Sequence, residues 1–222
     1  TLAEHGYQEV VLTGIHLSSY GLEWKDENGK QTEGLLDLIR AVHGVEGIKR
    51  IRLGSLEPRI VTEEFAKELA CLPKICPHFH LSLQSGCDAT LNRRYDAAEY
   101  REKCELLRKY FENPALTTDV IVGFPQESEE EFEASRDFVD SINFYETHIF
   151  KYSKRQGTKA AKMDGQIPEH EKTRRSNIML ELNRKKMQRY EEGWLGKKVE
   201  VLFEEMTERD GKNYVTGHTK EY

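Results

Sequence analysis

Residues 118–125 read Thr-Asp-Val-Ile-Val-Gly-Phe-Pro, a run of branched apolar residues that stops at glycine and proline. A short apolar run bounded by such turn residues is typical of a buried strand. Similar runs predict four more strands, at residues 9–13, 48–53, 79–83 and 147–152. Helical apolar patterns lie between them, at residues 35–45, 62–72, 97–111 and 128–142. The chain therefore alternates strand and helix over most of its length.

This alternation predicts an α/β fold with parallel strands, because each helical crossover returns the chain to the same end of the sheet. The residues alone leave two architectures open, an open doubly wound sheet and a barrel. In both architectures the ligand binds beyond the carboxyl ends of the strands. We therefore expect the functional site in the loops that follow the five predicted strands.

Each of those five loops mixes glycine with small polar residues. They are residues 14–21, 54–58, 84–88, 123–127 and 153–158. One such loop is an ordinary turn, but five at one edge predict a polar ligand held by backbone and hydroxyl groups. Asp119, His16, His80 and His148 lie on or just after strands, and we expect them to be hydrogen-bonded structural residues.

The composition is that of a globular protein with one main domain and part of a second, since 37% of the 222 residues are hydrophobic and 32% are charged. The net charge of −6 argues against a simple nucleic-acid coat. Without a long apolar run or a leader pattern, we expect a cytoplasmic protein with no membrane contact. The spacing of Cys71, Cys76, Cys87 and Cys104 fits neither a zinc site nor a ferredoxin-like run, so the sequence predicts no metal site.

A long polar helix is expected at residues 168–194, with an apolar stripe of Leu180, Met187, Tyr190 and Trp194. Two interpretations of its basic side chains stay open: they are solvated at the surface, or they form part of a surface that binds RNA phosphates. They are Arg174, Arg175, Arg184, Lys185, Lys186 and Arg189. After Gly196 the hydrophobic period changes to two, which predicts an antiparallel hairpin.

Four motifs at successive strand ends closely resemble those of the radical-SAM tRNA methylthiotransferases, which add a methylthio group to C2 of a modified adenosine beside the anticodon. The matching stretches are residues 12–21, 83–88, 118–125 and 150–158. Within the family, Thr-Gly-Ile-His-Leu-Ser-Ser-Tyr-Gly at residues 13–21 looks most like the subgroup that acts on threonylcarbamoyladenosine.

The resemblance implies a partial parallel (β/α) barrel of radical-SAM type, incomplete at its N-terminal side. It implies three parts: the barrel core at residues 1–167, a linking basic helix at residues 168–195, and the start of a TRAM-like RNA-binding β-barrel at residues 196–222. S-adenosylmethionine is the implied cofactor and the anticodon region of tRNA the implied partner. The oligomeric state stays open.

The resemblance also implies the site residues. Thr13, Gly14 and Ile15 would meet the methionine amino group of the cofactor, and Gln84 and Ser85 would lie near its ribose or carboxylate. Ile121 and Gly123 would border its adenine, with Phe150 and Tyr152 on the same side. Glu57, Arg94 and Arg155 are the candidates for substrate contact, because carboxylates and guanidinium groups recognise polar and anionic groups. No catalytic side chain and no metal ligand is predicted.

One departure from the family pattern is large. The family binds two 4Fe-4S clusters, one of them through a Cys-x-x-x-Cys-x-x-Cys loop after its first barrel strand, and the four cysteines here lack that spacing. We expect an inactive fragment of an active enzyme. Residues 91–95 are also about three residues shorter than in the family. Two alternatives stay open: an RNA-binding module without chemistry, and another partial-barrel radical enzyme such as a coproporphyrinogen oxidase relative.

Overall fold

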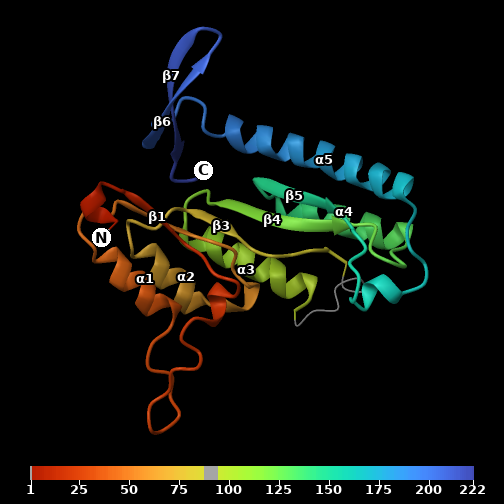
Figure 1. Cartoon of the computed structure of the whole chain (residues 1–222), viewed down its shortest axis with the longest axis horizontal. Coiled ribbons are helices and arrows are strands. Elements are labelled where there is room, and N and C mark those ends of the chain that lie inside the picture. Colours follow the sequence, from red (N-terminus) through yellow and green to blue (C-terminus); the bar gives the residue numbers. More distant parts are fainter. Residues whose placement is uncertain (1, 88–94) are drawn as a thin grey trace.

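The computed structural model describes residues 2–87 and 95–222 and confirms the predicted alternation of strands and helices (Figure 1). The strands of the main body are β1 (Glu9–Leu12), β2 (Arg50–Leu53), β3 (His78–His80), β4 (Ala115–Val122) and β5 (Glu146–Lys151). The helices are α1 (Leu35–His43), α2 (Glu63–Ala70), α3 (Ala97–Tyr110), α4 (Glu129–Ile142) and α5 (Glu169–Glu192). Short 3₁₀ turns cover Ala3–His5, Leu17–Ser19, Pro58–Ile60 and Ala160–Lys162.

All neighbouring strands of the main body are parallel and follow chain order. β1 pairs with β2, and β3, β4 and β5 form a second ladder. Two parallel bridges, Ile51 to Ile75 and Leu56 to Leu81, connect the ladders. Within the described residues no ladder joins β5 back to β1, so the sheet is an open, partial barrel. The predicted fold class is confirmed.

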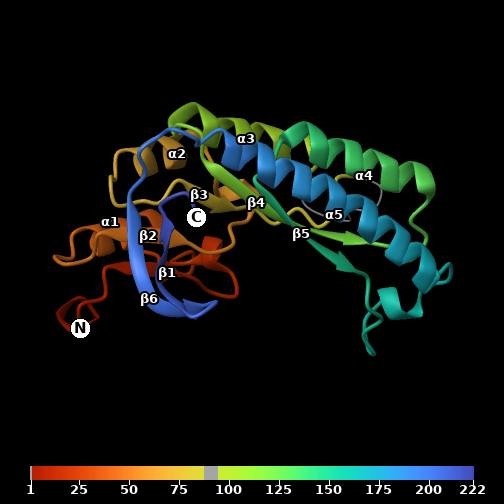
Figure 2. The same cartoon turned by 90° about the horizontal axis from the view of Figure 1, so that it is seen from above.

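Helices α1, α2 and α3 lie below the strands in the view of Figure 1, and α5 runs above β5, which it contacts (Figures 1 and 2). Ile39, Leu69, Phe79 and Leu107 are completely buried in this helix–sheet layer. Helix starts follow from local chemistry, because a polar side chain accepts an otherwise free amide proton in the first turn. Thr62 accepts from Phe65, and Ser128 with Glu131 forms a capping box at α4.

α5 buries the predicted stripe only in part, because Met187, Tyr190 and Trp194 are half-buried but Leu180 is not. Leu180 is 49% exposed, whereas Met179, one position earlier, is 1% exposed. The inner face also buries Arg175 and Lys186, so the reading of these bases as solvated is wrong. Arg175 Nη1 lies 2.6 Å from Glu127 Oε2, and Lys186 Nζ donates to the Asp140 carbonyl at 2.6 Å. A residue-type pattern cannot predict this, because the acceptors come from α4 and the loop before it.

The outward bases of α5 are also largely engaged. Arg174 is paired with Glu129 and Glu171, and Arg184 with Glu181. Their carboxylate partners neutralise much of the charge that an RNA-phosphate surface would use. These contacts weigh against the alternative in which α5 binds RNA without chemistry.

The predicted C-terminal hairpin is confirmed. β6 (Val201–Arg209) and β7 (Lys212–Thr219) pair antiparallel around a turn at Asp210 and Gly211, where both φ angles are positive. Most of the hairpin is exposed and projects from the body, while its base contacts β2 (Figure 1). The division of the chain into three parts stays a prediction. None of the described helices has both the length and the apolar character needed to span a membrane.

His78 on β3 is expected to make the fold acid-sensitive. Burial, with the Arg52 guanidinium and the rings of His80 and His148 nearby, lowers its pKa from 6.5 to about 3. The unfolded chain takes up this proton near pH 6.5, so the contribution of His78 to stability is complete above that pH and is lost as pH falls toward about 3. His78→Phe keeps an aromatic ring without the proton, and we expect a shallower fall of Tm across this range. Equal slopes for both proteins would contradict this.

Candidate active site

Two cavities lie side by side at the carboxyl ends of the strands. The first, the β1–β3 cavity, measures about 450 Å³ and the second, the β4–β5 cavity, about 520 Å³. The β1–β3 cavity is lined by Ile15, His16, Leu17, Ser18, Ser55, Leu56, Glu57, Ser82, Gln84 and Tyr95. The β4–β5 cavity is lined by Gln84, Asp119, Ile121, Phe150, Lys151, Tyr152, Ser153, Arg155, Thr158 and Ala160. The loops after β1, β2, β3 and β5 therefore meet at one rim, as the sequence predicted, whereas β4 contributes Asp119 and Ile121 from the strand itself and its loop at 123–127 lines neither cavity.

Gln84 borders both cavities. Its backbone is left-handed, with φ of 67°, a conformation that non-glycine residues adopt rarely and that costs free energy. Two hydrogen bonds to β4 hold it there: its N–H donates to the Asp119 carbonyl at 2.8 Å, and its carbonyl accepts from Ile121 N–H at 2.7 Å. The backbone of Gln84 is thus clamped where its amide side chain can reach either cavity.

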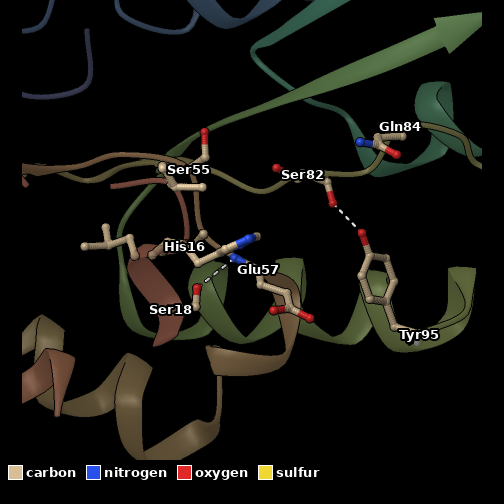
Figure 3. Close-up of a pocket in the computed structure, with 10 residues that line it drawn as sticks. His16, Ser18, Ser55, Glu57, Ser82, Gln84 and Tyr95 are labelled. Atoms are coloured by element: carbon tan, nitrogen blue, oxygen red, sulfur yellow. Dashed lines mark hydrogen bonds between the residues drawn. The ribbon is translucent and has the colours of Figure 1, made fainter. Parts of the chain in front are cut away.

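The β1–β3 cavity is polar and its walls are tied together (Figure 3). Ser18 Oγ accepts the Glu57 N–H at 2.9 Å, which joins the loop after β1 to the loop after β2. Tyr95 Oη donates to the Ser82 carbonyl at 2.6 Å and closes the opposite wall. The hydroxyl, imidazole, carboxylate and amide groups of this cavity can donate and accept hydrogen bonds, as recognition of a polar ring system requires.

The β4–β5 cavity combines apolar and charged groups. The rings of Phe150 and Tyr152 supply flat surface and Ile121 supplies aliphatic surface, while Asp119, Lys151 and Arg155 supply charges of both signs. The Tyr152 hydroxyl is buried and has no hydrogen-bond partner among the described residues. A buried polar atom without a partner costs free energy, so a ligand that bonds to this hydroxyl gains from it.

A second layer from α5 supports the β4–β5 cavity. Lys172 Nζ donates to the Tyr152 carbonyl at 3.0 Å. Its Cγ lies 2.4 Å from where a Cβ on Gly123 would stand, so only glycine fits there. Gly123 N–H donates to Glu127 Oε2 at 2.7 Å, and Glu127 is paired with Arg175. Sequence reasoning missed Lys172, Glu127 and Arg175 as supports of the site, because nothing in their local pattern shows that they are buried.

The cavities contain seven of the predicted site residues: Ile15, Glu57, Gln84, Ile121, Phe150, Tyr152 and Arg155. Four lie outside both linings: Thr13, Gly14, Ser85 and Gly123. Ser85 is buried, and its Oγ accepts the Cys87 N–H at 3.1 Å. Residues 91–94, which include Arg94, lie outside the described residues. The roles of all these residues stay predictions.

Asp119 and His80 make polar contacts of the expected structural kind, although Asp119 also lines the β4–β5 cavity and His16 lines the β1–β3 cavity. Asp119 Oδ1 accepts the Leu83 N–H at 3.3 Å, and His80 Nδ1 lies 3.0 Å from Thr117 Oγ1. The rings of His80 and His148 stack with centroids 5.6 Å apart. Burial lowers the pKa of His80, although the charge of Asp119 opposes that effect. Neutral imidazole is therefore the favoured form at this position.

The cysteines are dispersed, and two are buried. Burial raises the pKa of Cys76 to about 11 and that of Cys104 to about 12, which disfavours the thiolates that metals bind. Cys71 is exposed and Cys87 is half-buried. In the described part of the chain, no three His, Cys, Asp or Glu side chains gather in a way that could hold a metal ion.

Comparison with known proteins gives consistent matches. The family described as the Radical SAM superfamily matches residues 1–139. Threonylcarbamoyladenosine tRNA methylthiotransferase MtaB of Bacillus subtilis is 37% identical over 225 residues, which cover 100% of this chain and 49% of that protein. The tRNA-2-methylthio-N(6)-dimethylallyladenosine synthase of Acetivibrio thermocellus is 35% identical over 222 residues, with 99% and 45% covered. The chain thus spans about half the length of the curated relatives it matches.

A solved structure supports the fold alone. The radical S-adenosylmethionine methyltransferase TsrM from Kitasatospora setae has a TM-score of 0.52 and 18% sequence identity, over 68% of this chain and 28% of that one. Together, these matches confirm the predicted radical-SAM partial barrel and the predicted resemblance to tRNA methylthiotransferases.

Proposed function

Because the chain belongs to the radical SAM superfamily, we propose that it is the S-adenosylmethionine-binding part of an enzyme that adds a methylthio group to a modified adenosine of tRNA. One observation carries the proposal. Two cavities share a single lining residue, Gln84, whose backbone is held by two hydrogen bonds to β4. Reaction between a cofactor and a nucleoside requires that both be held in contact at a set orientation. An amide that can donate and accept is suited to contact both molecules.

We assign the cofactor to the β4–β5 cavity and the target nucleoside to the β1–β3 cavity. The residues present fit S-adenosylmethionine, which has an aromatic base, a ribose, a carboxylate and an ammonium group. Phe150 and Ile121 offer apolar surface to the adenine, the unpartnered Tyr152 hydroxyl offers a hydrogen bond, and Arg155 offers a guanidinium to the carboxylate. This assignment differs from the sequence prediction at two residues: Arg155 was expected to contact the substrate, and Ile15, expected to contact the cofactor, lines the nucleoside cavity. Bound S-adenosylmethionine would supply the methyl group and the radical chemistry of the reaction.

The residues of this chain do not fit an iron–sulfur cluster. The raised pKa values of Cys76 and Cys104 oppose metal binding, and the described cysteines do not gather at the rim. We therefore assign no step of the reaction to a cluster held here. In this proposal both 4Fe-4S clusters belong to other parts of the intact protein, and the 222-residue chain is inactive by itself.

The finer parts of the proposal rest on the motif at residues 13–21 and on the relatives. They are a threonylcarbamoyl-modified adenosine beside the anticodon, a cytoplasmic location, and a TRAM-like module that begins with hairpin β6–β7. Relatives named for the dimethylallyl nucleoside match to a similar extent. Modification of tRNA carrying one nucleoside or the other, measured with the intact protein, decides between the two substrates.

Replacing Gln84 by glycine in the intact protein is expected to weaken S-adenosylmethionine binding about tenfold or more and to abolish methylthiolation. Glycine suits the left-handed backbone, so the fold is spared. Gln126→Gly is the matched control, since Gln126 has φ of 70° but is exposed and lines neither cavity. Calorimetric titration with the cofactor and mass spectrometry of the tRNA provide the readouts. Full activity in the Gln84 variant would remove this site assignment.

A further inference from the structure

The end of the partial barrel at which β1 and β2 start, called the barrel floor below, binds a segment from the C-terminal end of the chain. β2 carries Arg50 and Arg52, which point to the same side of the strand because they are two residues apart. Their relative exposures are only 2% and 6%. Hairpin β6–β7 crosses the sheet here, at the end where β1 and β2 start and opposite the rim with the two cavities (Figure 2).

Arg50 binds both ends of the hairpin at once. Its Nη1 donates to the His218 carbonyl at 2.8 Å, where the chain leaves β7. Its Nη2 donates to the Glu200 carbonyl at 2.8 Å and to Glu200 Oε1 at 3.1 Å, just before the chain enters β6. One guanidinium therefore fixes the two sides of the hairpin base against β2.

Arg52 extends the same contact. Its Nη1 and Nη2 donate to the carbonyls of Lys220 and Thr219, each at 3.2 Å, and its Nε donates to Glu9 Oε1 at 2.9 Å. The guanidinium also lies 5.5 Å from the ring centroid of Tyr222. The segment that follows β7 is thus held in the floor of the barrel by hydrogen bonds and ring contacts.

This arrangement is specific to arginine. A buried guanidinium is costly unless its N–H donors find acceptors, and here each of the two arginines donates to two backbone carbonyls at the hairpin base and to one carboxylate. Lysine places a single ammonium on a flexible stem and lacks the fork that spans two chain segments. Arg40 on α1 shows the ordinary case, a 45% exposed side chain paired with Glu68 at the surface.

We propose that Arg50 and Arg52 are positioning residues that lock hairpin β6–β7 to the barrel floor and so set its orientation relative to the two cavities. The proposal rests on the proposed function in one respect, that the hairpin begins an RNA-binding module. A tRNA held by a locked module presents its adenosine to the β1–β3 cavity at high effective concentration. A module that swings freely binds tRNA without this advantage.

The test compares Arg50→Met with Arg40→Met in the intact protein. Glu9 keeps the 2.9 Å bond from Arg52 Nε to its Oε1 in the first variant and loses only the 3.9 Å contact of its Oε2 with Arg50 Nη1. Hydrogen exchange of backbone amides at residues 199–203 and 216–220 is expected to be about tenfold faster in Arg50→Met, with β3–β5 unchanged. KM for tRNA is expected to rise about tenfold, with kcat at saturating tRNA and S-adenosylmethionine affinity within about twofold of the parent protein. Arg40→Met is expected to change none of these.

Unchanged exchange at the hairpin base would overturn the lock. Faster exchange with an unchanged KM for tRNA would overturn the positioning role. If the methionine variant does not fold, Arg50→Lys, which keeps the charge but not the fork, is measured in the same way. A parent protein that leaves tRNA unmodified contradicts the proposed function alone, because the exchange measurement still decides whether the arginines hold the hairpin.

Discussion

Arg175→Met is expected to lower the free energy of unfolding by about 3–5 kcal/mol, the largest single effect at the site. Arg175 and Glu127 are 5% and 2% exposed, and Nη1 lies 2.6 Å from Oε2. Removing the guanidinium leaves the Glu127 carboxylate buried without its counter-charge. The same carboxylate accepts Gly123 N–H at 2.7 Å, so the loop after β4 is expected to loosen and cofactor affinity to fall with stability.

Urea unfolding of the chain measures the first effect, and titration of the intact protein with S-adenosylmethionine measures the second. Arg184→Met is the matched control on the same helix, because Arg184 and Glu181 are 63% and 50% exposed and such pairs contribute about 0–1 kcal/mol. Adding Glu127→Gln to Arg175→Met is expected to recover about 1–2 kcal/mol, since a neutral amide is cheaper to bury than an unpaired charge. A loss below about 1 kcal/mol in Arg175→Met would show that the pair does not support the fold.

Gly123→Ala is expected to cost about 2–5 kcal/mol and to abolish cofactor binding. Two effects add: the backbone has φ of +73°, which costs an alanine about 1–2 kcal/mol, and overpacking costs about 1–3 kcal/mol more. The added Cβ would stand 2.4 Å from Lys172 Cγ. Lys172 cannot easily move away, because its Nζ is bonded to the Tyr152 carbonyl on the wall of the β4–β5 cavity.

Gly157→Ala separates the two effects. Gly157 has φ of +87°, but a Cβ there meets nothing within 4 Å. Its replacement is therefore expected to cost only the backbone part, about 1–2 kcal/mol. Thermal unfolding of both variants gives the difference that belongs to the contact with Lys172. Equal losses of stability in the two variants would mean that the Lys172 side chain moves away from the added Cβ. In that case α5 does not support the cavity as inferred.

Much of the architecture could be predicted locally. The runs of branched residues and the glycine-containing loops depend on neighbours in sequence, and they were found where expected. The caps at Thr62 and Ser128 are local interactions of the same kind. The common rim followed from the alternation alone, because parallel strands have their carboxyl ends on one side. β3 was the weak point: only His78–His80 forms a ladder, since Leu81 and Gln84 pair through single bridges.

The buried charges could not be predicted in this way. An arginine has the same local pattern whether its guanidinium meets water or a partner far along the chain. Arg175 meets Glu127 across 48 residues, and Arg50 meets Glu200 across 150. The same is true of Gln84, whose strained backbone depends on β4 and not on its neighbours in sequence.

The sequence by itself determined the parallel α/β class, the rim that carries the cavities, and the family resemblance. These depend on residue type and spacing, and both can be read along one dimension. Only the tertiary structure decided that Gln84 stands between two cavities, that α5 turns basic side chains inward, and that two arginines of β2 hold the C-terminal hairpin. The physical reason is that burying a charged or polar group costs free energy unless a partner compensates, and here the partners come from distant segments.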